Sequence, residues 1–316
     1  MLLGAWSSNQ SAFAPAGPHA GAVLTLSWVM FIGGGLILLL VLALIAYAMF
    51  ARTDRRGWLK RQGFVIGGGI VFPIVTLTAL LVYGSVLSRD LVSHPGPPDL
   101  RIEIVGEMWW WRVRYLGENG ETRFVTANEI RAPVGKSVEF ILLSQDVNHS
   151  FWVPNLAGKL DMIPGVANSY RFAANRPGIF RGQCAEYCGA QHTFMAFFFV
   201  ALAPDDFDAW AADQMRPAAR PDTDFLRRGE ALFLANGCGS CHQVRGTPAN
   251  GLLGPDLTHI GSRLSIGAAM FPNNVGTLAG WIASTQHLKP DALMPSFGNL
   301  DGVELRALAT YLESLK

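Results

Sequence analysis

Charged residues are missing from two long segments of this sequence. Residues 1–51 and 62–88 contain no aspartate, glutamate, lysine or arginine, although the chain of 316 residues has 25 basic and 24 acidic residues. Apolar runs of this length exceed an ordinary core helix, and about 20 such residues span a bilayer. The first run also lacks the basic start of a signal peptide. We therefore predict a two-helix transmembrane hairpin over residues 23–88, preceded by an N-terminal segment, residues 1–22.

A large charge imbalance is missing too, since the formal net charge is only +1. This argues against a nucleic-acid-binding protein, which would present a basic surface. The one local excess lies between the apolar runs, where residues 52–61 hold five basic residues and one acidic residue. The positive-inside rule places this loop, residues 51–61, in the cytoplasm. Both termini, and everything after residue 88, then lie on the outer side of the membrane.

The rest of the chain changes character twice. In residues 99–203 apolar residues such as Val138, Phe140 and Leu142 occupy every second position of short runs. Turns that contain glycine and proline separate these runs. The pattern predicts a β-sandwich or barrel. Residues 204–223 are acidic at first and then rich in proline, alanine and arginine, and they predict a linker with room for one helical turn. Residues 224–316 have helical apolar spacing near both ends. So small a helical domain, with its many glycines and prolines, usually needs a cofactor to complete its core.

Cysteine is scarce, with four in the chain, and the first two stand in the sequence CAEYCGAQHTFM. This stretch places Cys184, Cys188, His192 and Met195 within twelve residues. Thiolate, imidazole and thioether groups together suit copper. With His149 as a second imidazole, two thiolates can bridge two copper ions, each ion taking one imidazole, and Met195 is a weak axial ligand. The alternatives are a disulfide or a structural zinc site, although zinc has no need of the methionine.

The pattern C-x-E-x-C-x3-H-x2-M with an upstream histidine resembles the dinuclear copper A centre of cytochrome c oxidase subunit II. Two N-terminal membrane helices followed by an outer β-domain are similar to the same family, and the resemblance covers roughly residues 20–203. It implies a cupredoxin-like fold for residues 99–203. It also implies that Cys184 and Cys188 are the bridging thiolates, and that His149, His192 and Met195 are the terminal ligands.

The resemblance gives two further residues a role. Glu186 matches the residue whose carbonyl ligates copper and whose side chain helps to hold a magnesium ion at the contact with subunit I. Trp109 matches the tryptophan that receives electrons from a donor cytochrome. Trp110 stands where the family usually has tyrosine, and Glu107-Met108 replaces the usual His-Gln. The alternative for these tryptophans is core packing or an interfacial belt.

The second cysteine pair forms the sequence Cys238-Gly-Ser-Cys241-His242, the attachment signature for a c-type haem. The two thiols become thioethers on the porphyrin, and His242 binds the iron from one face. A thioredoxin-like redox pair is the alternative, but no βαβ pattern surrounds the motif. With two cysteines for copper and two for haem, no disulfide framework is expected.

The opposite face of the iron needs a second ligand, for which a thioether or an imidazole would serve. Met294 lies on a predicted turn before the last helix, a placement similar to that in class I cytochromes c. Met270 is the alternative, and His259 and His287 are weaker candidates.

Together these features predict subunit II of a haem-copper terminal oxidase with a fused class I cytochrome c domain over residues 224–316. We expect two copper ions, one covalent haem c and a magnesium ion as cofactors. The expected partners are subunit I, the other oxidase subunits, and a donor cytochrome c or quinol-oxidising complex. The expected location is a bacterial inner membrane, with both cofactor domains in the periplasm. Electrons would pass from the donor through haem c and copper A to subunit I, where oxygen is reduced to water.

Three other protein classes were weighed against this prediction. A quinol oxidase subunit would share the anchor and the sandwich but would lack the copper ligands. A copper-delivery protein would have no need of covalent haem. The small subunit of a copper A-containing nitric oxide reductase would look similar in this chain, so only its catalytic partner distinguishes that alternative.

Overall fold

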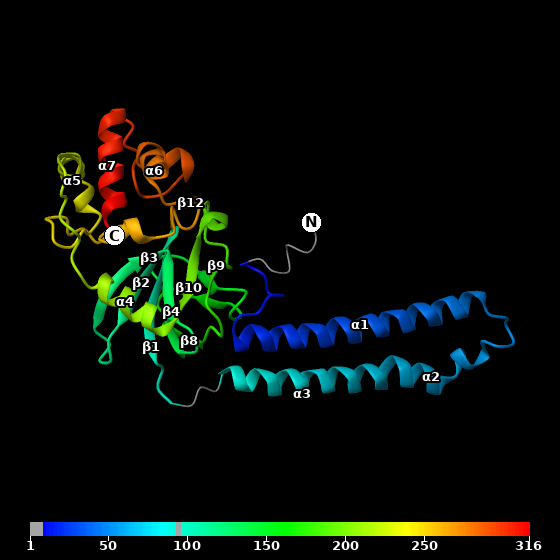
Figure 1. The fold of residues 1–316 in the computed structure, drawn as a ribbon. Helices are drawn as coiled ribbons and strands as arrows, with labels where there is room; N and C mark the ends of the chain where they lie inside the picture. Colours follow the sequence, from blue (N-terminus) through cyan, green and yellow to red (C-terminus); the bar gives the residue numbers. More distant parts are fainter. Residues whose placement is uncertain (1–8, 93–95) are drawn as a thin grey trace. The chain divides into compact units, whose positions relative to one another are not determined.

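The computed structural model describes residues 9–92 and 96–316, and the chain divides into two compact units (Figure 1). One unit comprises residues 21–96, and the other comprises the chain before and after them. Residues 1–8 of the predicted N-terminal segment 1–22 lie outside the described part of the chain.

The smaller unit is helical and apolar. Its helices are α1 (Pro18–Phe50), α2 (Gln62–Ile66) and α3 (Phe72–Val92), with a π-helical turn, Gly67–Val71, between the last two. Two spans, Pro18–Phe50 and Gln62–Arg89, are long and apolar enough to cross a membrane, and none of their most apolar residues is buried within the chain. Apolar surface of this extent has to be covered by lipid or by another protein. Helix α1 begins at Pro18 and not at residue 23, since proline is favourable in a first helical turn.

The predicted β-domain is a sandwich of two five-stranded sheets. The first sheet has the order β3-β2-β1-β5-β8 and the second the order β4-β10-β9-β6-β7. The strands are β1 (Leu100–Glu107), β2 (Trp110–Leu116), β3 (Thr122–Ala127), β4 (Glu129–Pro133), β5 (Val138–Ser144), β6 (His149–Trp152), β7 (Leu160–Met162), β8 (Asn168–Phe172), β9 (Gly178–Cys184) and β10 (Ala196–Leu202).

Aromatic side chains fill the space between the two sheets. Trp111, Phe140, Phe151 and Phe197 are fully buried, and the rings of Phe151 and Phe197 stack with their centroids 4.9 Å apart. They point inward because successive strand residues face opposite sides of a sheet. This aromatic core holds the ends of β6, β9 and β10 in fixed positions, and the first cluster of candidate ligands lies at those ends.

The segment at the start of the first apolar span is bound to the sandwich by backbone hydrogen bonds. The amide of Ala16 donates to the carbonyl of Asn155 at 2.6 Å, and that of Ala20 donates to Leu156 at 3.1 Å. A Cβ on Gly17 would lie 2.7 Å from the carbonyl oxygen of Leu156, so the close approach of the two backbones needs glycine. Residues 9–20 are therefore part of the sandwich domain.

The predicted linker over residues 204–223 contains a longer helix than the single turn that its sequence suggested. Residues Pro204–Gln214 form helix α4, which buries Phe207 and Ala211 in the sandwich core. The ring of Trp210 on the same helix lies 5.4 Å from that of Tyr115, measured between centroids. Apolar residues at this spacing form one helical face, and that face packs on the sandwich.

The C-terminal domain is helical, as predicted. Helix α5 packs closely against α7, and the small hairpin of β11 and β12 was not foreseen from the sequence. The buried core of the C-terminal domain includes Phe233, Leu308 and Tyr311. The elements are α5 (Asp224–Ala235), β11 (Ser265–Ile266), β12 (Phe271–Pro272), α6 (Val275–Leu288) and α7 (Gly302–Ser314).

The contact between α5 and α7 predicts a specific need for glycine at position 229. A Cβ there would lie 2.3 Å from the carbonyl oxygen of Ala307, so Gly229→Ala must push the helices apart. We expect it to destabilise this domain by about 1–3 kcal/mol. Hydrogen exchange of the α5 and α7 amides in the full chain measures this loss.

Gly280→Ala in α6 is the matched control, since a Cβ there meets no neighbour within 4 Å. That change should stabilise its helix by roughly 0.5–1 kcal/mol. Equal exchange in the two variants would contradict the packing account.

Candidate metal centre

One hairpin loop and one strand end bring the first cluster together. Cys184 is the last residue of β9, and Met195 immediately precedes β10. The amide of Cys184 donates to the carbonyl of Met195 at 2.8 Å, which closes the base of the loop. His149 is the first residue of β6, which pairs with β9 through Phe151 opposite Cys184. Sheet pairing thus brings residue 149 beside residue 184.

The side-chain donors of the cluster lie within one small volume. The Sγ atoms of Cys184 and Cys188 are 3.7 Å apart. The Nδ1 atom of His149 is 3.8 Å from Cys184 Sγ, and the Nδ1 atom of His192 is 3.6 Å from Cys188 Sγ. The Sδ atom of Met195 is 3.8 Å from Cys188 Sγ. All five side chains that the sequence predicts as copper ligands therefore converge around the two sulfurs, with one imidazole beside each sulfur.

The two cysteines are free thiols, and their separation is far longer than the roughly 2 Å of a disulfide bond. A hydrogen bond from the Cys188 thiol lowers the pKa of Cys184 to about 4. The same bond, together with burial, raises the pKa of Cys188 far above its usual range. One thiolate forms easily, whereas the second needs a cation to replace its proton, so the pair is suited to bind metal.

His149 is held by Asp146, a residue that was not singled out in the sequence. The Nε2 atom of His149 lies 2.8 Å from Asp146 Oδ1, so its Nδ1 atom faces Cys184. Burial lowers the pKa of His149, but the hydrogen bonds with Cys184 and Asp146 outweigh burial and leave that pKa raised. Asp146 Oδ2 also accepts from the amide of Met108 at 2.7 Å. A carboxylate three residues before a candidate ligand was the available signal, because ligating histidines usually bond such a partner.

Glu186 contributes its backbone and its side chain in different directions. Its carbonyl oxygen lies 3.1 Å from Cys184 Sγ and so can act as a further ligand. Its carboxylate is 42% exposed and lies 3.4 Å from the ammonium of Lys159, which also pairs with Asp161 at 3.2 Å. Lys159 thus pairs with both carboxylates and competes with any cation for the side chain of Glu186.

Trp109 packs directly on the loop. Its indole Nε1 donates to the carbonyl of Cys188 at 2.8 Å, and the residue is only 8% exposed. Its own carbonyl accepts from the ammonium of Lys289, a residue of the C-terminal domain, at 2.8 Å. Trp111, by contrast, is a core residue, so the packing alternative holds for that residue.

The second cluster is arranged around His242. Cys238 begins a 3₁₀ turn, Cys238–Ser240, and the amide of His242 donates to the Cys238 carbonyl at 3.0 Å. The Nδ1 atom of His242 lies 2.8 Å from the carbonyl oxygen of Pro255, which leaves Nε2 for a metal. Burial lowers the pKa of His242 and favours the neutral ring that an iron ligand needs. A Cβ on Gly254 would lie 2.5 Å from this ring, so the loop packs tightly against it.

A buried arginine in the same domain also fits a haem. The Nε atom of Arg263 is buried and has no hydrogen-bond partner among the described residues, although its NH2 group donates to the carbonyl of Asp256. A buried guanidinium with a free N–H is suited to an anionic group such as a haem propionate.

The candidates for the second iron ligand differ in their surroundings. Met294 is partly buried against the domain core, whereas Met270 lies in the turn between β11 and β12. The Nε2 atom of His259 bonds the carbonyl of Arg216 at 3.1 Å, and His287 is exposed on α6. Both methionines are partly buried, and Met294 is the one that packs against the described core of the domain.

Comparisons with known proteins match both domains. The family described as "Cytochrome C oxidase subunit II, periplasmic domain" matches residues 114–201, and the family described as "Cytochrome c" matches residues 226–316. Cytochrome c oxidase subunit 2 of Alkalihalophilus pseudofirmus is 37% identical over 251 residues, covering 78% of this chain and 71% of that protein. The corresponding subunit of Bacillus sp. strain PS3 is 30% identical and covers 78% and 72%.

Among solved structures, the periplasmic domain of cytochrome oxidase subunit II of Bradyrhizobium japonicum matches with 30% identity. The match covers 38% of the present chain and 96% of the Bradyrhizobium chain, with a TM-score of 0.36.

The Asp146–His149 hydrogen bond predicts that Asp146→Ala weakens copper binding by about 10–100-fold, since loss of an outer partner frees the imidazole to rotate. A copper titration of the full chain against a competing chelator measures the change. Asp99→Ala, just before β1 at the end away from the loop, is the control and should leave the affinity unchanged. Unaltered affinity in the Asp146 variant would remove Asp146 from the site.

Proposed function

The chain belongs to the cytochrome c oxidase subunit II family, and on that premise we propose that it carries electrons into a haem-copper terminal oxidase through two cofactors of its own. The observation that carries the proposal is the convergence of two thiols, two imidazoles and a thioether within 3.6–3.8 Å of neighbouring donors. A copper-delivery protein would need no second, haem-binding cluster.

We assign the copper ligands to His149, Cys184, Cys188, His192 and Met195, with the carbonyl of Glu186 as the sixth. The two thiolates and two imidazoles would supply the strong ligands of both coppers, and Met195 and the Glu186 carbonyl would complete the set. The closed base of the loop and the Asp146 bond hold the ligands before metal arrives. Such preorganisation limits the geometric change between oxidised and reduced states.

We assign the haem to Cys238 and Cys241 as covalent attachment points, with His242 and Met294 as the iron ligands. Pro255 orients the His242 ring, and a thioether ligand raises the haem potential. When bound, the haem and the copper pair each take up and release single electrons. Trp109 is the proposed receiving residue, because it touches the Cys188 carbonyl on one side and Lys289 of the haem domain on the other.

The remaining assignments concern the complex. We propose that the two apolar spans anchor the chain in a bacterial inner membrane, with the basic loop in the cytoplasm and both cofactor domains in the periplasm. Subunit I would accept the electrons and reduce oxygen to water, and a cytochrome c or quinol-oxidising complex would supply them. Fusion of the haem domain keeps its local concentration at the copper site high. A magnesium ion at Glu186 would require subunit I to draw Lys159 away.

The first test is the cofactor content of the purified full chain. We expect two coppers and one covalent haem per chain, and electron transfer without oxygen reduction by the chain alone. Metal analysis and a pyridine haemochrome assay measure the content. One copper per chain, or a disulfide between positions 184 and 188 in active enzyme, would contradict the proposal.

Met195→Leu tests the copper assignment. Removal of the weak axial thioether should change the copper absorption bands and potential while leaving two coppers bound, because the thiolates and imidazoles remain. The haem spectrum serves as the internal control and should not change. A copper spectrum identical to that of the parent chain would exclude Met195 as a ligand.

Met294→Leu and Met270→Leu form a matched pair for the haem iron. The first should abolish the absorption band of methionine-ligated ferric haem and lower the haem potential, since a thioether ligand raises it. The second should leave both unchanged. The reverse result would move the ligand to the turn between β11 and β12.

A further inference from the structure

A buried lysine of the haem domain (residues 224–316) binds the backbone of the copper domain (residues 99–203). The ammonium of Lys289, which is 3% exposed, donates to the carbonyls of Trp109 at 2.8 Å and Phe194 at 2.9 Å. It also donates to Gly267 of its own domain at 3.2 Å. Three carbonyl acceptors match the three N–H donors of an ammonium group.

The two acceptors in the copper domain stand next to the candidate ligands. Phe194 precedes Met195, and Trp109 donates its indole N–H to the Cys188 carbonyl. A lysine needed only for the stability of its own domain would not reach across to these groups. Burial of a charge is costly, so a well-satisfied buried ammonium indicates a specific positional role.

A strained turn of the haem domain contacts the same loop. The amide of Ala196 donates to the carbonyl of Ala268 at 3.3 Å. Gly267, Ala268 and Ala269 have φ angles of 66°, 66° and 59°, in the left-handed region. An alanine in this region has a steric cost that glycine does not have, and Ala268 is 1% exposed. Such a backbone persists only where its surroundings hold it in place. Here the surroundings include the end of the copper loop, residues 184–195, through the Ala196–Ala268 hydrogen bond.

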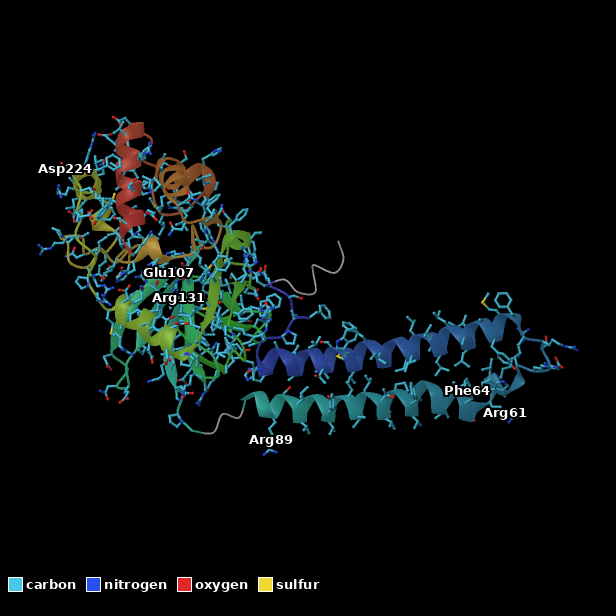
Figure 2. The ribbon with its side chains drawn as sticks, viewed as in Figure 1. Arg61, Phe64, Arg89, Glu107, Arg131 and Asp224 are labelled. Atoms are coloured by element: carbon cyan, nitrogen blue, oxygen red, sulfur yellow. The ribbon has the colours of Figure 1, made fainter. Side chains whose placement is uncertain are left out.

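A second group of contacts prevents rotation about this point. Glu129 accepts from the amide of Leu264 at 2.8 Å, and Arg131, labelled in Figure 2, donates to the carbonyl of Ser262 at 3.1 Å. The end of α4 is bound as well, because Arg245 donates to the carbonyl of Gln214 at 2.6 Å. Contacts at separate points define one orientation of the two domains.

We propose that Lys289 and the turn Gly267–Ala269 form a docking clamp that fixes the haem domain on the copper loop. Lys289 is thus a positioning residue for electron transfer from haem to copper. This inference rests on the proposed function, since it concerns the path between the two assigned cofactors. The clamp makes the haem domain a fixed donor and not a domain that swings on its linker.

Lys289→Met in the full, cofactor-loaded chain tests the clamp. The methionine side chain is unbranched and one atom shorter than lysine, and it removes all three hydrogen bonds. Loss of one hydrogen bond to a charged group changes an equilibrium constant by about tenfold or more. The docked orientation should therefore be less populated, and we expect haem-to-copper transfer to slow by about tenfold or more. Photoreduction of the haem by a flavin, followed at the copper absorption band, measures the rate. Hydrogen exchange should become faster at the Ala196 amide and in residues 264–272.

Lys316→Met is the matched control, because Lys316 lies in the same domain, its side chain is 61% exposed, and it pairs with nearby Glu313. It should change neither readout. Ala268→Val and Ala268→Gly give an independent pair, since valine is excluded from a left-handed φ whereas glycine adopts it freely. We expect the valine variant to slow transfer and the glycine variant to match the parent chain.

The outcomes separate the clamp from the function on which it rests. No haem-to-copper transfer in the parent chain would overturn the proposed function itself. Transfer in the parent chain with unchanged rate and exchange in Lys289→Met would overturn the clamp alone. If Lys289→Met loses a cofactor, the Ala268 pair decides: a slow valine variant beside a normal glycine variant supports the clamp, and two normal variants overturn it.

Discussion

The backbone hydrogen bond from Cys184 to Met195 is the constraint on which the candidate metal centre depends. It joins the ends of β9 and β10 and so turns twelve residues into a closed loop. Closure of the loop brings its two thiols, one imidazole and the thioether close together. The second imidazole arrives because β6 pairs with β9 and places His149 beside Cys184. The aromatic core between the sheets keeps these strand ends in register.

The same loop is the surface on which the haem domain docks. Trp109 and Phe194 present carbonyl groups to Lys289, and the amide of Ala196 bonds the turn at Ala268. Domain docking thus uses Phe194 of the loop itself, Trp109 between β1 and β2, and Ala196 at the start of β10, all of them beside the candidate ligands. A change in the docking contact is expected to shift the candidate ligands, and a change in the ligands to shift the docking contact, because a closed loop transmits displacement along its backbone.

Much of the fold could be predicted from the sequence because its signals are local. Absence of charge over long runs indicates membrane spans, alternation indicates strands, and the spacing of Cys238, Cys241 and His242 identifies a haem attachment site. The length of helix α4 was missed because its apolar face, including Phe207, is short and lies in a segment of linker composition. His149 was assigned because the copper set needed a second imidazole, but the pairing of β6 with β9 that brings it to Cys184 could not be predicted, because residue types alone do not determine which strands pair.

The sequence by itself determined the ligand types and their number, since copper and haem chemistry need thiols, imidazoles and thioethers whatever the fold. Only the tertiary structure decided how those ligands are held. Asp146 orients His149, Lys159 occupies the place beside Glu186, and Lys289 reaches the copper loop from far along the chain. The physical reason is that a carboxylate or an ammonium looks the same in any sequence. Its role is determined by burial and by the partners that folding brings within hydrogen-bond distance.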